Sequence, residues 1–279
     1  SLGAASVTVD GNLLAFSTDV VGDERYTLRI KDLRTGELYD DVISDIAAGA
    51  TWVGSGHLFY QRLDEAWRPD SVWRHAVGTP VSEDVRVFHE PDEAYWVGVG
   101  TTRSEKYLIF EAGSKITSET WYLECSDPTA EPTCVRPRER GVEYDVDHAV
   151  IGGEDVWLVT HNMTGPNFAL GAVPVGSFES VDDLRELIAH RDDVRVEGVD
   201  CFARLALSVL DGSSLDDADP VFSELEFPEE LYTAASAGNP EWDAPVLRFS
   251  YGSFTTPTEV WQLDVATGAR EMLKRQPVR

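Results

Sequence analysis

Hydrophobic and polar residues alternate over short stretches along most of the chain, which is typical of β-strands with one buried face. Six of these stretches are strongly apolar and lie at residues 12–19, 57–64, 107–114, 155–162, 205–212 and 246–253. One stretch has a helical spacing instead, because Leu187 and Ile188 follow Leu184 at three and four positions. The pattern therefore predicts a chain built almost entirely of strands, with one helix over residues 181–190.

The apolar stretches recur at regular distances, since their first residues are separated by 45, 50, 48, 50 and 41 positions. In five of the six, a loop leads to a second predicted strand, at residues 25–33, 71–79, 119–127, 167–175 and 259–268. Two of these strands end in nearly the same turn, Leu33-Arg34-Thr35-Gly36 and Val265-Ala266-Thr267-Gly268, and further strands follow at 37–43 and 85–90. A period of about 40 to 50 residues with three or four strands is the pattern of a β-propeller blade.

We therefore predict an all-β propeller as a single domain over residues 1–279, with repeats beginning near residues 7, 50, 95, 143, 196 and 242. A sandwich of two sheets would not need a unit this long. The fifth repeat has a weak second strand, so we expect a shortened or poorly ordered blade around residues 211–230. Six repeats fit either a six-bladed ring or a fragment of a seven-bladed propeller that lacks its first blade. In the second case, uncovered blade faces would favour self-association.

The chain is strongly acidic: 23 Lys and Arg against 50 Asp and Glu give a formal net charge of −27. Nucleic acid is therefore not an expected partner, because phosphate binding needs a basic surface. An anionic membrane surface is disfavoured for the same reason. Basic peptides or cations are compatible with this charge, and the alternative interpretation is that it only keeps the protein soluble.

Targeting and redox signals point to a cytoplasmic protein. The chain has no apolar run of about 18 residues that would predict a membrane helix. Its N-terminal segment lacks the basic and apolar regions of a signal peptide, so we interpret it as a chain entered part-way. Cys125, Cys134 and Cys201 are odd in number and have no C-x-x-C spacing, which favours reduced thiols. A Cys125–Cys134 disulfide is the alternative.

No catalytic or cofactor-binding motif is found in the sequence. There is no G-x-S-x-G nucleophile elbow, P-loop, G-x-G-x-x-G, H-E-x-x-H or EF-hand loop. We therefore expect no cofactor, no metal site and no complete catalytic apparatus within these residues.

Two local features could bind a ligand. Glu143, Asp145 and Asp147 would share one face of a strand, where they could receive a cation or a basic side chain, or form a solvated face. Asp23 and Glu24 lie at a predicted hairpin tip, and loop tips on one rim of a propeller are common recognition sites. A plain charged turn is the alternative for this second feature.

Several motifs, in their expected order, resemble the oligopeptidase B branch of the prolyl oligopeptidase family of serine peptidases. They run from about residue 7 to 279, weakest between 211 and 230. The most specific are Val72-Trp73-Arg74-His75-Ala76-Val77-Gly78-Thr79, Glu143-Tyr144-Asp145 with His148, and Leu247-Arg248-Phe249-Ser250-Tyr251-Gly252-Ser253 with Thr255-Thr256-Pro257.

The resemblance implies a seven-bladed propeller that covers a C-terminal α/β-hydrolase domain carrying a Ser-Asp-His triad. It implies that this chain lacks the catalytic domain and is inactive alone, whereas the parent protein cleaves short peptides after Arg or Lys. The propeller would admit short peptides and exclude folded proteins, and its negative charge would attract basic peptides.

By the same resemblance, Glu24 is the first candidate for contact with substrate or with the hydrolase domain, with Asp23 beside it. Arg103, Arg138 and Glu143 are candidates for salt bridges between the domains. Two other functions remain open. One is the propeller of a related prolyl- or acylaminoacyl-peptidase, and the other is a stand-alone protein-interaction propeller.

Overall fold

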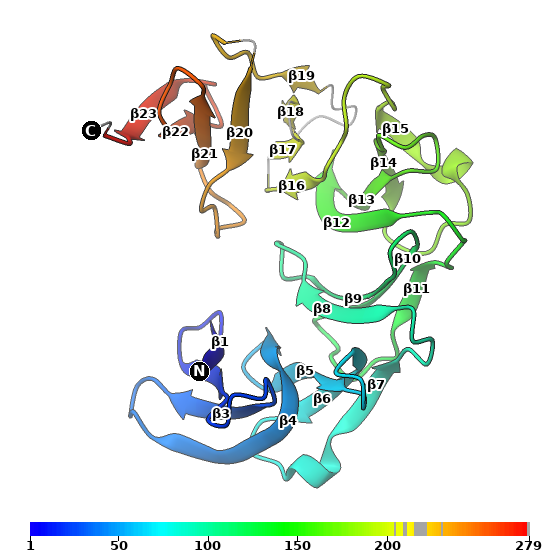
Figure 1. Cartoon of the computed structure of the whole chain (residues 1–279), viewed down its shortest axis with the longest axis vertical. Coiled ribbons are helices and arrows are strands. Elements are labelled where there is room, and N and C mark those ends of the chain that lie inside the picture. Colours follow the sequence, from blue (N-terminus) through cyan, green and yellow to red (C-terminus); the bar gives the residue numbers. More distant parts are fainter. Residues whose placement is uncertain (204, 209–210, 215–221, 230, 278–279) are drawn as a thin grey trace. The chain divides into compact units, whose positions relative to one another are not determined.

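The computed structural model describes the whole chain except residues 204, 209–210, 215–221, 230 and 278–279 (Figure 1). Apart from two 3-10 turns, η1 (Val81–Glu83) and η2 (Val181–Asp183), every regular element in the described part is a β-strand. The prediction of an all-β chain is therefore confirmed. The six apolar stretches correspond to β2 (Leu13–Thr18), β5 (His57–Leu63), β9 (Tyr107–Gly113), β13 (Glu154–His161), β17 (Leu205–Ser208) and β21 (Val246–Ser253).

Each apolar strand lies second in a group of four antiparallel strands that are adjacent in sequence. The first strands are β1 (Leu2–Val7), β8 (Trp96–Thr101), β12 (Tyr144–Ile151), β16 (Val199–Cys201) and β20 (Tyr232–Ser236). The third are β3 (Tyr26–Asp32), β6 (Pro69–Ala76), β10 (Ser118–Glu124), β14 (Ala169–Pro174), β18 (Asp211–Ser214) and β22 (Glu259–Asp264). The outer strands are β7 (Val85–His89), β11 (Thr133–Arg136), β15 (Arg185–Ile188), β19 (Ser223–Glu224) and β23 (Arg270–Arg275).

The first two groups share one long strand, β4 (Leu38–Val53), and so form a continuous seven-stranded sheet, β1 to β7. The early part of β4 pairs with β3 and its late part with β5, and Ile46 pairs with both Tyr26 and Arg62. β4 is therefore the outer strand of the first group and the inner strand of the second.

Contacts along the chain define two compact units, Ser1–Val142 (unit 1) and Glu143–Arg279 (unit 2). Unit 1 contains β1 to β11, and unit 2 contains β12 to β23. The single domain over residues 1–279 stays a prediction, and the two units are described separately below.

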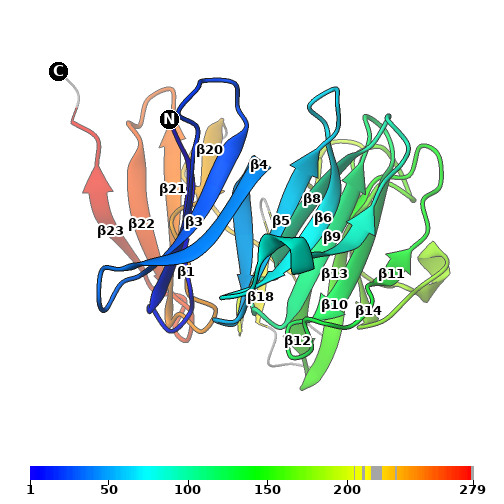
Figure 2. The ribbon, with the colours of Figure 1, turned by 90° about the horizontal axis from the view of Figure 1, so that it is seen from below.

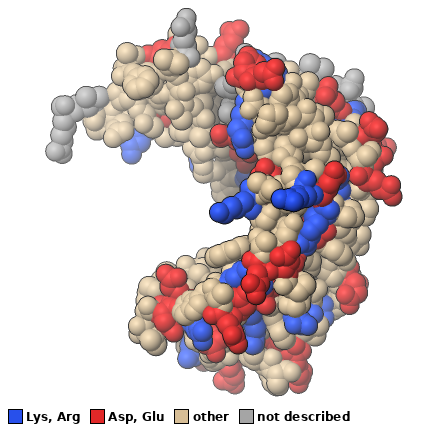
Figure 3. All heavy atoms as spheres, turned by 45° about the vertical axis from the view of Figure 1, so that its right-hand side comes forward, with Lys and Arg blue, Asp and Glu red and all other residues tan. Residues whose placement is uncertain are grey.

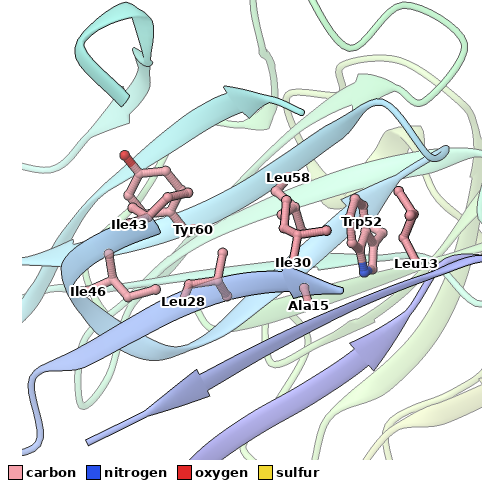
Figure 4. Packing of buried hydrophobic residues seen from close by; sticks show 9 residues of the cluster. All are labelled: Leu13, Ala15, Leu28, Ile30, Ile43, Ile46, Trp52, Leu58 and Tyr60. Carbon is pink, nitrogen blue, oxygen red and sulfur yellow. The ribbon is translucent and has the colours of Figure 1, made fainter. Parts of the chain in front are cut away.

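Alternating burial along the strands builds the core of each unit. In β2 and β3 every second residue is buried, and these residues meet Ile43, Ile46 and Trp52 of β4 (Figure 4). A second cluster of unit 1 packs Phe59 and Val72 against Phe110 of β9. The cores of unit 2 centre on Leu158 and Leu170 in one cluster and on Phe249 and Tyr251 in another. Stacking of sheet faces explains why the apolar stretches recur with the blade period.

The helix predicted over residues 181–190 is wrong. The segment forms the single turn η2, capped by the Ser180 side chain, and then β15, which pairs with β14. Four residues of an outer strand complete the hydrogen bonds of β14, whereas so short a helix is costly to nucleate. Leu184 reaches the sheet because Gly171 of β14 has no side chain to block it.

The fifth group contains four short strands, β16 to β19, of two to four residues each. The prediction of a weak second strand concerns residues 211–230, and much of that segment lies outside the described residues. All three cysteines are free thiols, so the alternative of a Cys125–Cys134 disulfide is not realised. None of the helices in the described part is long and apolar enough to cross a membrane.

The strands of each unit end at two opposite edges, where the connecting segments lie (Figure 2). In unit 1, loops 19–25 and 64–68 both lie next to the middle of β4, because Ile46 pairs beside each of them. Segments 90–95 and 137–142 join the same edge through the contacts described below, and segment 114–117 joins it because the Gly141 N–H donates to Thr117 Oγ1 at 3.0 Å. We call these five segments edge 1 of unit 1. Turns 8–12, 54–56 and 102–106 lie at the opposite strand ends.

Candidate functional site

Edge 1 of unit 1 begins with loop 19–25, which carries Asp23 and Glu24. The buried carboxylate of Asp19 accepts backbone N–H groups of Val21 at 2.8 Å, Gly22 at 2.6 Å and Glu24 at 3.1 Å. These bonds, the Gly22 bond first, lower the pKa of Asp19. The backbone of the loop is thus held from inside, while the side chains of Asp23 and Glu24 remain exposed.

Arg25 connects this loop to its neighbour, loop 64–68. Its guanidinium carbon lies 4.9 Å from the centre of the Trp67 ring, a cation–π contact. Trp67 has a positive φ of 67°, an uncommon conformation for a large residue, and it is 38% exposed. The two loops therefore form one continuous surface.

Arg68 connects loop 64–68 to segment 90–95. Its buried side chain pairs with Asp64 at 2.9 Å, and its Nη1 donates to three carbonyl oxygens, of Glu90, Asp92 and Tyr95. One arginine thus holds the path of this segment, in addition to the hydrogen bond that the Glu90 N–H donates to Asp70 of β6.

Arg138 then connects segments 90–95 and 137–142. Its guanidinium pairs with Glu119 at 2.7 Å and also with Glu90, and it lies 4.0 Å from the centre of the Tyr95 ring. Burial disfavours the charged guanidinium, but the hydrogen bonds to Glu90 and Glu119 outweigh it, so the pKa of Arg138 is raised. Arg138, predicted as a bridge between domains, is thus already paired inside unit 1.

Exposed apolar side chains lie on this edge and beside it, at the first residue of β8, and they also occur at the opposite edge, where Val9 is 74% exposed. Val20 is 92% exposed, Val21 82%, Trp96 60% and Ile116 50%. Exposed acidic side chains lie among them, and they belong to Asp23, Glu24, Glu65, Asp92, Glu93 and Glu139. The sequence analysis missed the apolar component, although two consecutive valines in a predicted turn were a signal of it. Neighbouring exposed apolar side chains with polar residues around them are one mark of a surface that another protein covers.

The other predicted site residues lie elsewhere. Arg103 belongs to turn 102–106 at the opposite edge of unit 1, because Thr101 pairs with Leu108 at that end of β8 and β9. Glu143 belongs to unit 2, where its backbone N–H donates to Asn162 Oδ1 at 2.9 Å. The structure therefore joins Asp23, Glu24 and Arg138 on one edge and separates Arg103 from them.

The predicted acidic ladder is only partly present. Glu143 precedes β12, Asp145 is exposed and Asp147 is half-buried on the same face, while His148 points to the buried face and bonds Asp155 at 2.9 Å. Among residues with described positions, no group of three His, Cys, Asp or Glu side chains could hold a metal ion.

A second polar cluster explains part of the motif at residues 72–79. His75 is fully buried in β6, with Nε2 at 2.7 Å from Asp41 and Nδ1 at 2.7 Å from Asp84. The Tyr60 hydroxyl donates to the other oxygen of Asp84 at 2.7 Å. The imidazole thus ties β4 and the segment before β7 to the centre of the sheet, which is a structural role.

Unit 2 has an exposed apolar edge at its last sheet, β20 to β23. Phe254, in the loop between β21 and β22, is 95% exposed, and Leu231, just before β20, is 72% exposed. Both line a cavity of about 610 Å³ together with Gln276. β23 ends at this same edge, because Arg275 pairs with Glu259 and the Gln276 N–H donates to Thr258.

The net charge of −27 does not make every face uniformly acidic. Figure 3 shows Lys and Arg side chains directly beside Asp and Glu side chains on the visible face. Local pairs such as Arg136–Glu139, at 2.6 Å, account for part of this mixing. The charge of individual edges therefore has to be read from their own residues, because the net charge alone does not describe it.

Comparison with known proteins places these features in a family context. The family model for "Prolyl oligopeptidase, N-terminal beta-propeller domain" matches residues 1–276, which confirms the predicted β-propeller class. Dipeptidyl aminopeptidase BI of Pseudoxanthomonas mexicana is 35% identical over 289 residues, covering 100% of this chain and 39% of that protein. Protease 2 of Moraxella lacunata is 29% identical over 284 residues, and this match covers 98% of this chain and 39% of that protein.

Solved structures agree with this. Oligopeptidase B of Trypanosoma brucei, in a closed form with covalently bound antipain, is 30% identical with a TM-score of 0.86. That match covers 100% of this chain and 41% of the solved chain. Oligopeptidase B of Leishmania major has the same fold, with a TM-score of 0.86 at 24% identity, 100% coverage of this chain and 41% of the other. The chain thus spans about two fifths of the length of these proteins.

Proposed function

Because the chain belongs to the prolyl oligopeptidase family and forms its N-terminal β-propeller domain, we propose that it controls substrate access to a peptidase domain of the same protein. The observation that carries this proposal is the match over residues 1–276, together with relatives that are more than twice as long. The remaining part would be an α/β-hydrolase domain with the Ser-Asp-His triad, and the parent protein would be a cytoplasmic serine peptidase.

We place the contact with that domain at the apolar edges described above. A domain that follows β23 in the chain would be reached from the edge of the last sheet, which exposes Phe254 and Leu231. Edge 1 of unit 1 offers the same kind of surface, with Val20, Val21 and, beside it, Trp96. Isolated apolar side chains are common on protein surfaces, but pairs of highly exposed ones that are neighbours, such as Val20 and Val21, fit an interface.

The acidic part of edge 1 supports a preference for basic peptides. Asp23 and Glu24 are exposed on a loop whose backbone is fixed by Asp19, so their charges are held in place at the edge. A cationic peptide approaching this edge would be attracted over roughly one Debye length, about 8 Å at physiological salt. We propose that the parent enzyme cleaves short peptides after Arg or Lys.

The test uses the full-length protein that carries this chain. It is assayed with Arg- and Lys-coumarin peptides of increasing length and with a folded protein that contains the same sequence in a loop. We expect cleavage of the short peptides, inhibition by a serine-directed reagent and no cleavage of the folded protein. No peptide hydrolysis, or a reading frame that stops after Arg279, would exclude the peptidase and leave a stand-alone interaction propeller. Digestion of the folded protein as fast as of the short peptides would exclude a role of the propeller in controlling substrate access.

A second specificity is favoured by one relative. The name of the P. mexicana protein, dipeptidyl aminopeptidase BI, indicates release of N-terminal dipeptides, and its identity over the whole of this chain is 35%. Peptide substrates with a free N-terminus and with an acetylated N-terminus distinguish the dipeptidyl activity from the oligopeptidase activity. Cleavage only with a free N-terminus supports the dipeptidyl activity, and cleavage of both supports the oligopeptidase. Hydrolysis only after proline, or only of a terminal acetylated residue, would assign the related prolyl or acylaminoacyl specificity.

A further inference from the structure

Unit 2 contains a small cavity with aromatic walls, about 240 Å³ in volume, between the last sheet and segment 225–229. This is room for about eight water molecules, so it suits a small ligand. Four aromatic side chains and two arginines line it, namely Phe227, Phe249, Tyr251, Trp261, Arg270 and Arg275. None of its lining residues belongs to edge 1 of unit 1, and the proposed function does not use it.

The aromatic walls are held in position by one another. The Phe227 ring stacks on Tyr251 with centroids 5.0 Å apart and planes 5° apart, and it meets Phe249 edge-on at 6.0 Å. Phe249 and Tyr251 are 6% and 4% exposed. The Tyr251 hydroxyl donates to Glu229 at 2.7 Å, which ties segment 225–229 to the sheet. The cavity is therefore formed before any ligand binds.

The one carboxylate that lines the cavity, that of Glu259, already has hydrogen-bond and ion-pair partners. Glu259 is 2% exposed, and it accepts hydrogen bonds from Trp261 Nε1 at 2.7 Å and from Arg275 Nε at 2.6 Å. Trp261, Arg275 and Glu259 all belong to the last sheet, so the hydrogen bonds of this carboxylate are made within the sheet. A cationic ligand would gain little from Glu259 and would face both guanidinium groups.

Arg270 is the second cation that lines the cavity. Its Nη1 donates to the Glu226 carbonyl at 2.8 Å, and its guanidinium carbon lies 5.7 Å from the centre of the Phe227 ring. No Asp or Glu among the residues with described side chains forms an ion pair with it. Its planar group matches a carboxylate, and the aromatic rings beside it match a flat apolar body.

We propose that this cavity binds a small carboxylate with an aromatic or flat apolar body, with Arg270 pairing to the carboxylate and the Phe227, Tyr251 and Trp261 rings enclosing the rest. The carboxylate could be that of a free acid or that at the C-terminus of a short peptide. Both share the chemistry that Arg270 recognises.

Isothermal titration of the full-length protein with 3-phenylpropionate tests the proposal. We expect saturable binding to one site, at least about tenfold weaker binding of 3-phenylpropionamide, and a similar loss in Arg270→Gln. Arg248→Gln is the matched control, because Arg248 is exposed on the adjacent position of β21, on the other face of the sheet from Phe249. It should bind as the unmodified protein does, and melting curves establish that both variants fold.

A second series identifies the source of the carboxylate. N-acetyl-Ala-Phe with a free C-terminus is compared with its C-terminal amide as a competitor of 3-phenylpropionate. Competition by the acid alone assigns the site to peptide C-termini, and failure of both to compete assigns it to free acids. Absence of saturable binding, equal binding of acid and amide forms of phenylpropionate, or equal affinities of the two Arg→Gln variants would overturn the proposal.

Discussion

The guanidinium of Arg25 lies against the Trp67 ring at 4.9 Å, and this contact joins two loops that the sequence places in different repeats. Trp67 makes this contact from a backbone conformation with a φ of 67°. From this pair, hydrogen bonds and ion pairs continue along the edge through Arg68 and Arg138. The edge that carries the acidic candidates is thus held by side chains from several loops, and its parts are expected to respond together to mutation.

Replacing Trp67 by Ala should loosen loop 19–25 without unfolding unit 1. A cation–π contact at an exposed site contributes about 0.5–1 kcal/mol, so amide exchange in residues 20–24 should accelerate about two- to fivefold. Hydrogen exchange followed by mass spectrometry measures this. Trp96→Ala is the control, since Trp96 is exposed beside the same edge and makes no ring contact with a described residue. Equal exchange in both variants would mean that Arg25 and Trp67 do not hold the loop.

Replacing Arg138 by Met should be strongly destabilising. It leaves Glu90 and Glu119, which are 3% and 8% exposed, without their cation, and breaking a buried pair in this way costs about 3–5 kcal/mol. Urea unfolding measures the loss. Arg140→Met, at an exposed neighbouring position, should change stability by less than about 0.5 kcal/mol. A loss below about 1 kcal/mol for Arg138→Met would contradict a structural role for the pair.

His75→Leu should destabilise unit 1 by about 3 kcal/mol or more, because it leaves Asp41 and Asp84 buried without the imidazole between them. The double variant His75→Leu with Asp84→Leu should recover part of the loss, since it removes one of the two stranded carboxylates. Thermal and urea unfolding of the single and double variants measure both effects. A double variant that is clearly less stable than His75→Leu alone would contradict this explanation. It would mean that the buried carboxylates are not what destabilises the single variant.

The turn after β3 should make stability depend on pH through Asp32. Its carboxylate accepts hydrogen bonds from the Arg34 side chain and from the Arg34 and Thr35 N–H groups, and these lower its pKa to about 2. A carboxyl with a lowered pKa stabilises the folded state above its ordinary value of 3.8 and loses that contribution as the pH falls toward 2. The stability difference between the unmodified protein and Asp32→Asn should therefore be constant above pH 5 and shrink between about pH 4 and 2. A difference that does not change with pH would contradict this.

Charge reversal at Glu24 tests the recognition role of edge 1 in the full-length protein. Glu24→Arg should lower kcat/KM for dibasic peptides about threefold at low salt and less for singly basic ones, because exposed charges act weakly and over short distances. Glu37→Arg makes the same charge change at the opposite edge, in the exposed turn after β3. It should leave kcat/KM unchanged. Raising the ionic strength should remove the difference, and equal kinetics of the two variants at low salt would remove Glu24 from the site.

Local patterns predicted the apolar strand of each repeat and, in five of the six repeats, the strand that follows it. Their positions follow from local alternation, and the turns after β3 and β22 follow from Asp32 and Asp264 with Gly36 and Gly268, whose φ angles are 80° and 70°. Each of these depends only on residues close together in the chain. The one local prediction that failed, the helix over 181–190, failed because pairing with β14 stabilises an extended segment more than its apolar spacing stabilises a helix.

Which of the candidate residues lie close together depends on contacts between segments far apart in the sequence. Asp23 and Glu24 share an edge with Arg138, whereas Arg103, predicted together with Arg138 as a bridge between domains, lies at the opposite edge of the same unit. The pairing of Arg138 with Glu90 and Glu119 and of Arg25 with Trp67 depends on how loops of neighbouring sheets meet. That meeting is set by the stacking of sheets through residues far apart in sequence, such as Phe59 and Phe110, and local alternation carries no information about it.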